Sequence, residues 1–338
     1  MGFFNECSYV LRKSNKDMIV INGGSNLVCN YFKNSDLFIL KENIMNIPLD
    51  YSKYYFDIDS NDNIYGIYID NCINILKLNN NTTRFKPLYT VDYDFINFDI
   101  TFPYIKFIDS EMHIIYYLTN KSNPTTILFH HYYNGSTWVE NKIDFINLPI
   151  LDNFIVNFNN NTPTIFYIKD HNDFSQICSS TFNTNSCTWD NRILITDSSS
   201  NKIYLSVLKD KLNFYHFSYC ESIEGKYSIK YLNGYLKNNF FEELTNKFLN
   251  TPHVYLFPSL LEYKNIIYIF YIEDNKLYTF YTKDLGINWS EPIEDCYSIN
   301  EKFIRSYFKS KYKDDLSYNT NTLFTCKNPF SILGNFEQ

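Results

Sequence analysis

Short runs of β-branched and aromatic residues recur along the chain, and clusters of Asn, Asp, Gly and Lys separate them. In the clearest stretch four runs follow one another, at 258–263, 265–272, 276–281 and 288–293. Runs of this length between turn-forming residues are typical of β-strands joined by hairpins. Helical periodicity is almost absent. The pattern therefore predicts an all-β chain built from units of four short strands.

The rare residue tryptophan gives a repeat length for these units. Trp138, Trp189 and Trp289 are separated by 51 and 100 residues, which is one period and two, and Phe240 lies where the missing copy is expected. Further copies are placed at Phe38, Phe85 and Phe336. A period of about 50 residues with several strands per unit is the signature of β-propeller blades.

The repeats use up the whole chain, so we expect a single β-propeller domain over residues 1–338. Seven blades are predicted, at approximately 1–50, 51–98, 99–150, 151–200, 201–250, 251–299 and 300–338. The first and last units have the weakest strand patterns, so six blades with a closing blade shared by the two chain ends is the alternative. For the Glu-rich stretch up to Leu249, a helical turn is an alternative to a strand.

One turn carries a recognisable motif. Thr282, Asp284, Gly286 and Trp289 fit the pattern Ser/Thr-x-Asp-x-Gly-x-x-Trp, which resembles the Asp-box of sialidase-like β-propellers. We expect Asp284 to accept hydrogen bonds from backbone N–H groups, Gly286 to supply a positive φ, and Trp289 to pack between neighbouring sheets. The resemblance implies a structural role, because the Asp-box of that family lies on the face opposite the active site.

Composition and charge limit the classes of partner and the cellular locations that we expect. The formal net charge is −7 and no Lys/Arg block stands out, which disfavours a nucleic-acid partner. The longest apolar run, 266–272, is far shorter than the roughly 20 residues that span a bilayer. The start of the chain has no secretory pattern. We expect a protein from an AT-rich bacterial genome that is cytoplasmic or exported without a classical signal, with a spore or surface location as a further option.

Other features predict no metal and no cofactor. The eight cysteines form no Cys-x-x-Cys pair, and reduced thiols are expected, with a Cys178–Cys187 disulfide as the alternative. His130 and His131 should point to opposite faces of one strand, one packed and one exposed. The stretch 57–63 loosely resembles a calcium loop but lacks the distal Glu of a full ligand set. Phosphate-loop, zinc-protease and serine-hydrolase motifs are absent.

A ligand site is expected on the propeller rim formed by loops that precede the first strand of each blade and loops that join the second strand to the third. Blades converge there and can direct several side chains at one point. The candidate ligand-binding residues are Tyr54, Asp99, Tyr104, Asp170, His171, Asp173, His253, Tyr255, Glu273, Asp274 and Arg305. Further candidates on loops of this rim are Lys53, Tyr55, Asp70, Asp152 and Asn153. A hairpin tip rich in Asp and Asn is more often a solvated turn.

Three function classes remain. A true sialidase is disfavoured because the resemblance implies three arginines around the substrate carboxylate, and Arg84 and Arg192 of the four in this chain lie on the wrong rim. The family's Phe-Arg-Ile-Pro motif is also missing. A glycoside hydrolase with paired carboxylates stays open. The preferred hypothesis is a non-catalytic propeller that presents a Tyr-rich rim to a glycan or protein. A structural component of a bacterial coat or sheath is the third alternative.

Overall fold

The computed structural model describes residues 6–46, 48–79, 83–123, 125–299, 301–327 and 330–334. The chain forms two compact units. Unit 1 comprises residues 1–2, 149–305 and 317–338, and unit 2 comprises residues 3–148 and 306–316. Apart from two short 3-10 helices, Tyr51–Lys53 and Lys313–Ser317, the regular structure of the described residues consists of strands. The predicted all-β class is therefore confirmed.

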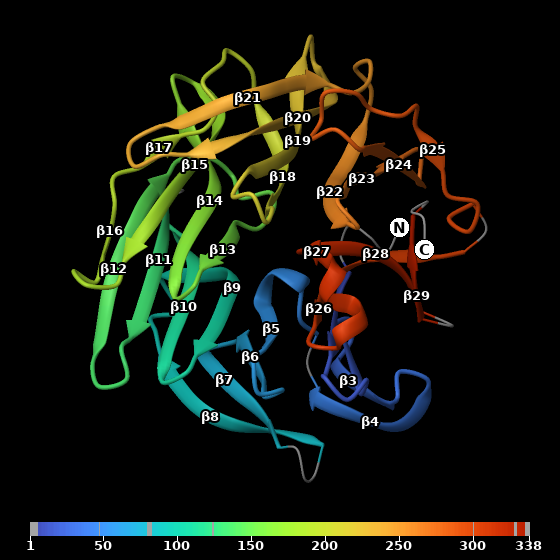
Figure 1. The fold of residues 1–338 in the computed structure, drawn as a ribbon. Coiled ribbons are helices and arrows are strands. Elements are labelled where there is room, and N and C mark those ends of the chain that lie inside the picture. Colours follow the sequence, from blue (N-terminus) through green and yellow to red (C-terminus); the bar gives the residue numbers. More distant parts are fainter. Residues whose placement is uncertain are drawn as a thin grey trace. The chain divides into compact units, whose positions relative to one another are not determined.

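Unit 2 consists of antiparallel sheets whose strands follow chain order (Figure 1). The first contains β1 (Cys7–Arg12), β2 (Met18–Asn22), β3 (Leu27–Lys33) and β4 (Leu37–Met45). The second contains β5 (Tyr54–Ile58), β6 (Ile64–Ile69), β7 (Cys72–Asn79) and β8 (Arg84–Asp92). The third contains β9 (Phe98–Ile108), β10 (Glu111–Asn120), β11 (Thr126–Tyr133) and β12 (Trp138–Ile146). Residues 306–310 of β26 (Phe303–Ser310) also belong to this unit.

Unit 1 repeats the same arrangement. One sheet contains β13 (Ile155–Asn159), β14 (Thr162–His171), β15 (Phe174–Asn183), β16 (Thr188–Trp189) and β17 (Ile193–Leu194). The next contains β18 (Lys202–Lys209), β19 (Tyr215–Ile223), β20 (Lys226–Leu236) and β21 (Phe241–Phe248). The third contains β22 (Tyr255–Tyr263), β23 (Ile266–Glu273), β24 (Lys276–Thr282), β25 (Ile293–Glu294) and β27 (Tyr318–Thr320). β28 (Thr322–Lys327) pairs with β29 (Phe330–Leu333).

The core lies around the inner strands of the sheets, because strands such as β5, β19 and β23 are buried on both faces while outer strands such as β8 and β21 are mostly exposed. Every residue of β5 is buried, whereas β8 is almost entirely exposed. β11 alternates buried and half-buried positions along its length, as the pleat of a strand requires. Inner strands therefore read as continuous apolar runs and outer strands as mixed ones.

One expectation about local structure needs correction. The Glu-rich stretch up to Leu249 contains strand β21, paired with β20, and not a helical turn. Near the end of the chain, β27 pairs with β22. The number of blades and the closure of a ring stay predictions.

The three tryptophans occupy equivalent places. Trp138 begins β12 opposite Tyr133, and Trp189 lies in β16 opposite Phe182. After β24, the residue next to Trp289 continues the same pairing, since Ser290 N donates to Tyr281 O. Each tryptophan therefore follows the turn that leaves the third strand of its sheet, which accounts for the period of 51 residues. Phe336, assigned to the same repeat, lies outside the described residues.

The turn at 282–289 has the hydrogen bonds and backbone geometry that the motif predicts. Asn288 N donates to Asp284 Oδ1 at 2.8 Å, and Gly286 N donates to Thr282 Oγ1 at 3.0 Å. Gly286 has φ +88°, and the Trp289 indole N–H donates to the Gly286 carbonyl oxygen at 3.1 Å. The indole packs edge-on against Tyr231 of β20, at 4.8 Å between ring centroids. The expected local contacts are present, while membership of the sialidase-like superfamily stays a prediction.

The adjacent histidines point to opposite faces, as predicted. His130 is fully buried and lies 3.1 Å from His113, ring nitrogen to ring nitrogen. The expectation that the other would be exposed is wrong, because only 16% of the His131 side chain is exposed and its ring contacts Tyr116. Cys178 and Cys187 are not joined by a disulfide. None of the described helical segments has the length and apolarity needed to cross a bilayer.

Candidate functional site

The best-defined polar group of unit 1 surrounds a buried arginine. Arg305, the third residue of β26, is 6% exposed, and its guanidinium carbon lies 3.7 Å from the ring centroid of Phe257. Its Nη1 lies 3.5 Å from Asp152 Oδ2, just before β13. Tyr204 of β18 packs on Phe257 at 4.4 Å between centroids. We call Asp152, Tyr204, Phe257 and Arg305 the arginine group.

The two aromatic residues of this group have unusual backbones. Tyr204 has φ +57° and Phe257 has φ +51°, in the left-handed region that bulky residues rarely adopt. At both places the pairing with the next strand shifts register, so each residue lies in a β-bulge. Such conformations cost on the order of 1–3 kcal/mol each and cluster at functional sites, where bulges redirect side chains. The aromatic rings are therefore held in place by the fold.

A second group lies at the same end of β22. His253 Nδ1 is 3.5 Å from Glu273 Oε1, at the end of β23, and Tyr255 follows two residues after the histidine. The His253 side chain is 45% exposed and that of Glu273 is 26% exposed, so both reach solvent. Burial raises the pKa of Glu273, against the opposing effect of His253. We call His253, Tyr255 and Glu273 the histidine group.

The two groups are neighbours in unit 1. Tyr255 and Phe257 are two residues apart on β22, and the Cys220 thiol, on β19, donates to the Tyr255 carbonyl oxygen at 3.5 Å. Burial raises the pKa of Tyr204, and the Asp152 carboxylate adds to the effect. Burial also raises the pKa of Tyr255 to about 12. Both hydroxyls are neutral at neutral pH, and that of Tyr255 already donates to the Thr251 carbonyl oxygen at 3.0 Å.

Arg305 and Phe257 are 6% and 5% exposed, and Tyr204 is half-buried, so Tyr204 is the member of the arginine group with an accessible ring. The guanidinium is a planar donor group suited to carboxylate or hydroxyl oxygens, and a tyrosine ring can stack on a sugar. The histidine group adds a half-exposed donor and acceptor pair. The sequence analysis named Arg305, His253, Tyr255, Glu273 and Asp152 as candidates, and the structure brings them to this end of unit 1, while their role in binding stays a prediction. It did not name Tyr204 and Phe257, although Phe257-Pro258 repeats Phe102-Pro103 in the sequence.

The remaining candidates lie elsewhere. Tyr54 and Tyr104 are buried in unit 2, where Tyr54 donates to the Cys7 carbonyl oxygen, and Asp99 pairs with Lys53 at 2.7 Å. Within unit 1, Asp170 and His171 end strand β14 and are half-buried. Neither belongs to the contacts that define the two groups.

Two further candidates are explained by their turns. Asp173 has φ +68° and follows Asn172 at +50°, and Asp274 has φ +48° before Asn275 at +64°. Two consecutive positive φ values are the requirement of a tight two-residue hairpin, and Asn and Asp tolerate them best. Both aspartates are exposed, so the hairpin turn itself accounts for their presence.

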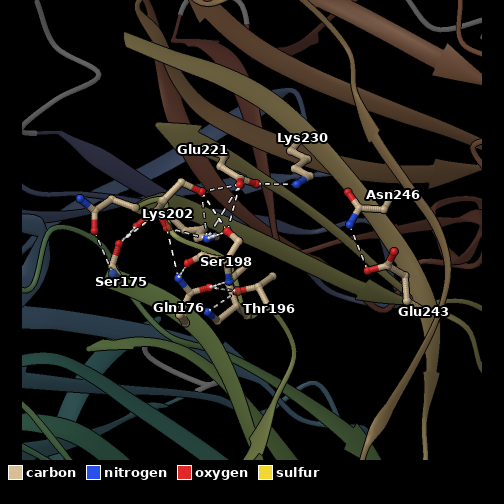
Figure 2. A network of polar contacts seen from close by, with 12 residues as sticks. Ser175, Gln176, Thr196, Ser198, Lys202, Glu221, Lys230, Glu243 and Asn246 are labelled. Atoms are coloured by element: carbon tan, nitrogen blue, oxygen red, sulfur yellow. Dashed lines mark hydrogen bonds and ion pairs between the residues drawn. The ribbon is translucent and has the colours of Figure 1, made fainter. Parts of the chain in front are cut away.

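A separate buried network links successive sheets of unit 1 near the loop 196–201 (Figure 2). The ammonium of Lys202, 1% exposed, donates to Ser198 Oγ and to the Ser200 carbonyl oxygen at 2.6 Å. Glu221 of β19 lies 3.9 Å from Lys202 Nζ and 2.7 Å from Lys230 Nζ. The loop is thereby tied to β18, β19 and β20.

The other side of the network is supplied by β15. Gln176 donates to the Ser198 carbonyl oxygen at 2.6 Å and accepts from Thr196 Oγ1 at 2.9 Å, while Ser175 Oγ and the Lys202 backbone exchange hydrogen bonds (Figure 2). A polar network that is so extensively bonded rigidifies the elements it joins. We assign it to holding the loop, not to binding a ligand.

Replacing Lys202 with Met should change how stability depends on alkaline pH. Burial lowers the pKa of Lys202 from 10.5 to about 8. Between these two values the unfolded chain holds more protons than the folded one, so the free energy of unfolding of the wild type should rise with pH relative to that of the variant. Urea unfolding from pH 7.5 to 10.5 measures this difference. Parallel curves for the two proteins would contradict the prediction.

Comparisons with known proteins add information on fold alone. No protein-family description matches this sequence, and no curated protein matches it. Among solved structures, an ulvan lyase of a new polysaccharide lyase family, bound to -[GlcA(1-4)Rha3S]-, is similar with a TM-score of 0.61 at 11% identity, over 98% of this chain and 94% of that one. Polysaccharide lyase Uly1 has a TM-score of 0.56 at 10% identity, over 85% and 81%.

A further similar structure is that of a variant of the alpha-L-arabinofuranosidase arb93a from Fusarium graminearum in complex with an iminosugar inhibitor. Its TM-score is 0.54 at 9% identity, over 82% of this chain and 94% of that one. Together with the successive antiparallel sheets, these likenesses place the chain among all-β, propeller-type folds that carbohydrate-active proteins also use.

Proposed function

We propose that this protein is a non-catalytic, propeller-type glycan-binding protein whose site is made by the arginine and histidine groups of unit 1. The observation that carries the proposal is the Arg305 guanidinium stacked on Phe257 at 3.7 Å, beside Tyr204 and Asp152. Aromatic faces beside a fixed fork of N–H donors suit a sugar, which has both apolar ring faces and many hydroxyls. The propeller-type fold, also found in carbohydrate-active proteins, agrees with this assignment.

Preorganisation supports a binding role. The positive φ values at Tyr204 and Phe257 and the burial of Arg305 mean that few rotamers are lost when a ligand binds. A protein partner would need a broad surface and not a group of this size. A coat or sheath component would need neither the strained aromatics nor the buried guanidinium.

The test is a glycan array followed by calorimetry, with Arg305→Lys as the site variant. Lysine keeps the charge but loses the planar stack and the fork, so we expect affinity for the glycan identified on the array to fall about tenfold, the equivalent of about 1.4 kcal/mol. Arg192→Lys, at an exposed position between β16 and β17, is the matched control and should bind as the wild type does. Thermal unfolding of both variants separates loss of binding from loss of fold. Unchanged affinity in folded Arg305→Lys would refute the site.

A glycoside hydrolase is the second candidate, because a carboxyl with a raised pKa lies beside a partly exposed imidazole. Such a carboxyl can serve as a general acid. A panel of chromogenic glycosides together with a reducing-end assay on polysaccharides tests it, with Glu273→Gln as the variant. Turnover by the wild type that is lost in Glu273→Gln would replace the binding proposal with an enzymatic one.

A further inference from the structure

In unit 2, one buried carboxylate holds two lysines from different strands. Asp57 of β5 has a side chain that is 4% exposed, and its Oδ2 lies 2.8 Å from the Lys106 ammonium of β9. Its Oδ1 lies 2.8 Å from the Lys309 ammonium of β26. The two lysine side chains are 21% and 23% exposed, so each still reaches solvent. The pair of ion contacts uses both carboxylate oxygens.

Aromatic hydroxyls and rings complete the surroundings of Lys309. Its ammonium donates to the Tyr55 hydroxyl at 2.5 Å and lies 4.9 Å from that ring's centroid and 5.7 Å from the centroid of Tyr104. Burial alone would lower the pKa of Lys309, but the Asp57 carboxylate outweighs it and raises that pKa. The lysine therefore stays charged throughout the neutral range.

A third lysine, Lys311, follows Lys309 by two residues. Within the described part of the chain, Lys311 has no carboxylate at ion-pair distance, although its side chain is half-buried. Burial lowers the pKa of Lys311, and repulsion from Lys106 and Lys309 adds to the effect, against the opposing charges of Asp57 and Asp59. Nearby Asp59 accepts hydrogen bonds from its own turn, from Asn61 N and Asn63 N at 2.8 Å each. The cluster therefore contains three ammonium groups around one buried carboxylate.

This excess of positive charge is conspicuous in a chain whose net charge is −7. Like charges held close together in a partly buried place repel one another, and an anion that binds among them removes the repulsion and gains charge-assisted hydrogen bonds. We propose that Lys106, Lys309 and Lys311 form an anion site that takes the carboxylate or sulfate group of an acidic glycan. The glycan as the source of the anion rests on the proposed function, whereas the anion site itself does not.

Lys311→Gln is the informative variant, because it removes one of the three positive charges and leaves both ion pairs of Asp57 in place. Thermal shift and calorimetry with sodium sulfate, glucuronate, a sulfated polysaccharide and a neutral polysaccharide should show saturable binding of the acidic ligands to the wild type. In Lys311→Gln that binding should weaken at least fivefold, with binding of neutral ligands unchanged. Lys33→Gln, at an exposed end of β3, removes the same charge elsewhere and should behave as the wild type.

The outcomes separate this inference from the proposed function. No saturable binding of sulfate or glucuronate, or equal binding by the wild type and Lys311→Gln, overturns the anion site even where neutral glycans bind on the array. Binding of the free ions without the sulfated polysaccharide overturns the glycan as their source. Loss of acidic binding in Lys311→Gln, while Arg305→Lys still binds acidic ligands, supports an anion site that is independent of the arginine group.

Discussion

Replacing Asp57 with Asn should lower the free energy of unfolding by about 3 kcal/mol, the lower end of what removing one partner of a buried ion pair costs. The carboxylate is 4% exposed and is paired with Lys106 and Lys309, so the amide would leave two ammonium groups close together without a counter-charge. Both lysines are about one-fifth exposed and can be partly hydrated, which keeps the loss from being larger. Urea unfolding followed by circular dichroism measures it.

Asp109→Asn is the matched control. Asp109 is exposed in the turn between β9 and β10 and has φ +53°, a conformation that asparagine tolerates well. Its substitution should change the free energy of unfolding by less than about 0.5 kcal/mol. Equal effects at the two positions would mean that the ion pairs of Asp57 do not stabilise unit 2.

Asp57→Asn should also make the free energy of unfolding depend less on pH in the acid range. Burial alone would raise the pKa of Asp57, but the charges of Lys309 and Lys106 outweigh it and hold that pKa below the ordinary value. The stabilisation is therefore fully present above the unfolded pKa of about 3.9 and is lost as the pH falls through the lower folded value. The difference in stability between wild type and Asp57→Asn should shrink as the pH falls below about 4.

Replacing Gly286 with Ala should destabilise the protein by roughly 2–4 kcal/mol, the sum of a backbone term and an overpacking term. An alanine Cβ would lie 2.0 Å from a ring carbon of Tyr231, which is fully buried and cannot move away freely. The residue also has φ +88°, which alanine adopts only with strain. Thermal and urea unfolding measure the loss.

Gly225→Ala separates the two terms. Gly225 has φ +79°, but no atom lies within 4 Å of where its Cβ would be. This variant should lose only about 1 kcal/mol of unfolding free energy, from backbone strain alone. If the two variants are equally destabilised, close packing of Gly286 against Tyr231 does not contribute to stability.

The strand pattern and the repeating turn could be predicted from the sequence because both are local. Side-chain alternation and turn residues such as Asp284 and Gly286 act over a few residues, so they read directly as strands and hairpins. For the Glu-rich part of β21 the sequence left a helical turn open, for the opposite reason. It is an outer strand with mostly exposed side chains, and its pairing with β20, not its own pattern, makes it a strand.

The lysine cluster has a sequence pattern whose meaning only the tertiary structure shows. Asp57, Lys106 and Lys309 each follow a tyrosine by two residues, in Tyr55-Phe56-Asp57, Tyr104-Ile105-Lys106 and Tyr307-Phe308-Lys309. All three triplets lie on first strands or on β26, so the charged positions come together within unit 2. A sequence shows that each position is charged but not that one carboxylate serves two lysines.

By itself, the sequence determined the all-β class, the hairpin order within each sheet and the geometry of the turn at 282–289. The tertiary structure alone decided which charges pair, which tyrosines are buried and which aromatics adopt positive φ at the bulges of β18 and β22. The physical reason is range: hydrogen bonding in turns and the pleat of a strand depend on neighbours in sequence. Burial, ion pairing and backbone strain depend on residues brought together from distant parts of the chain.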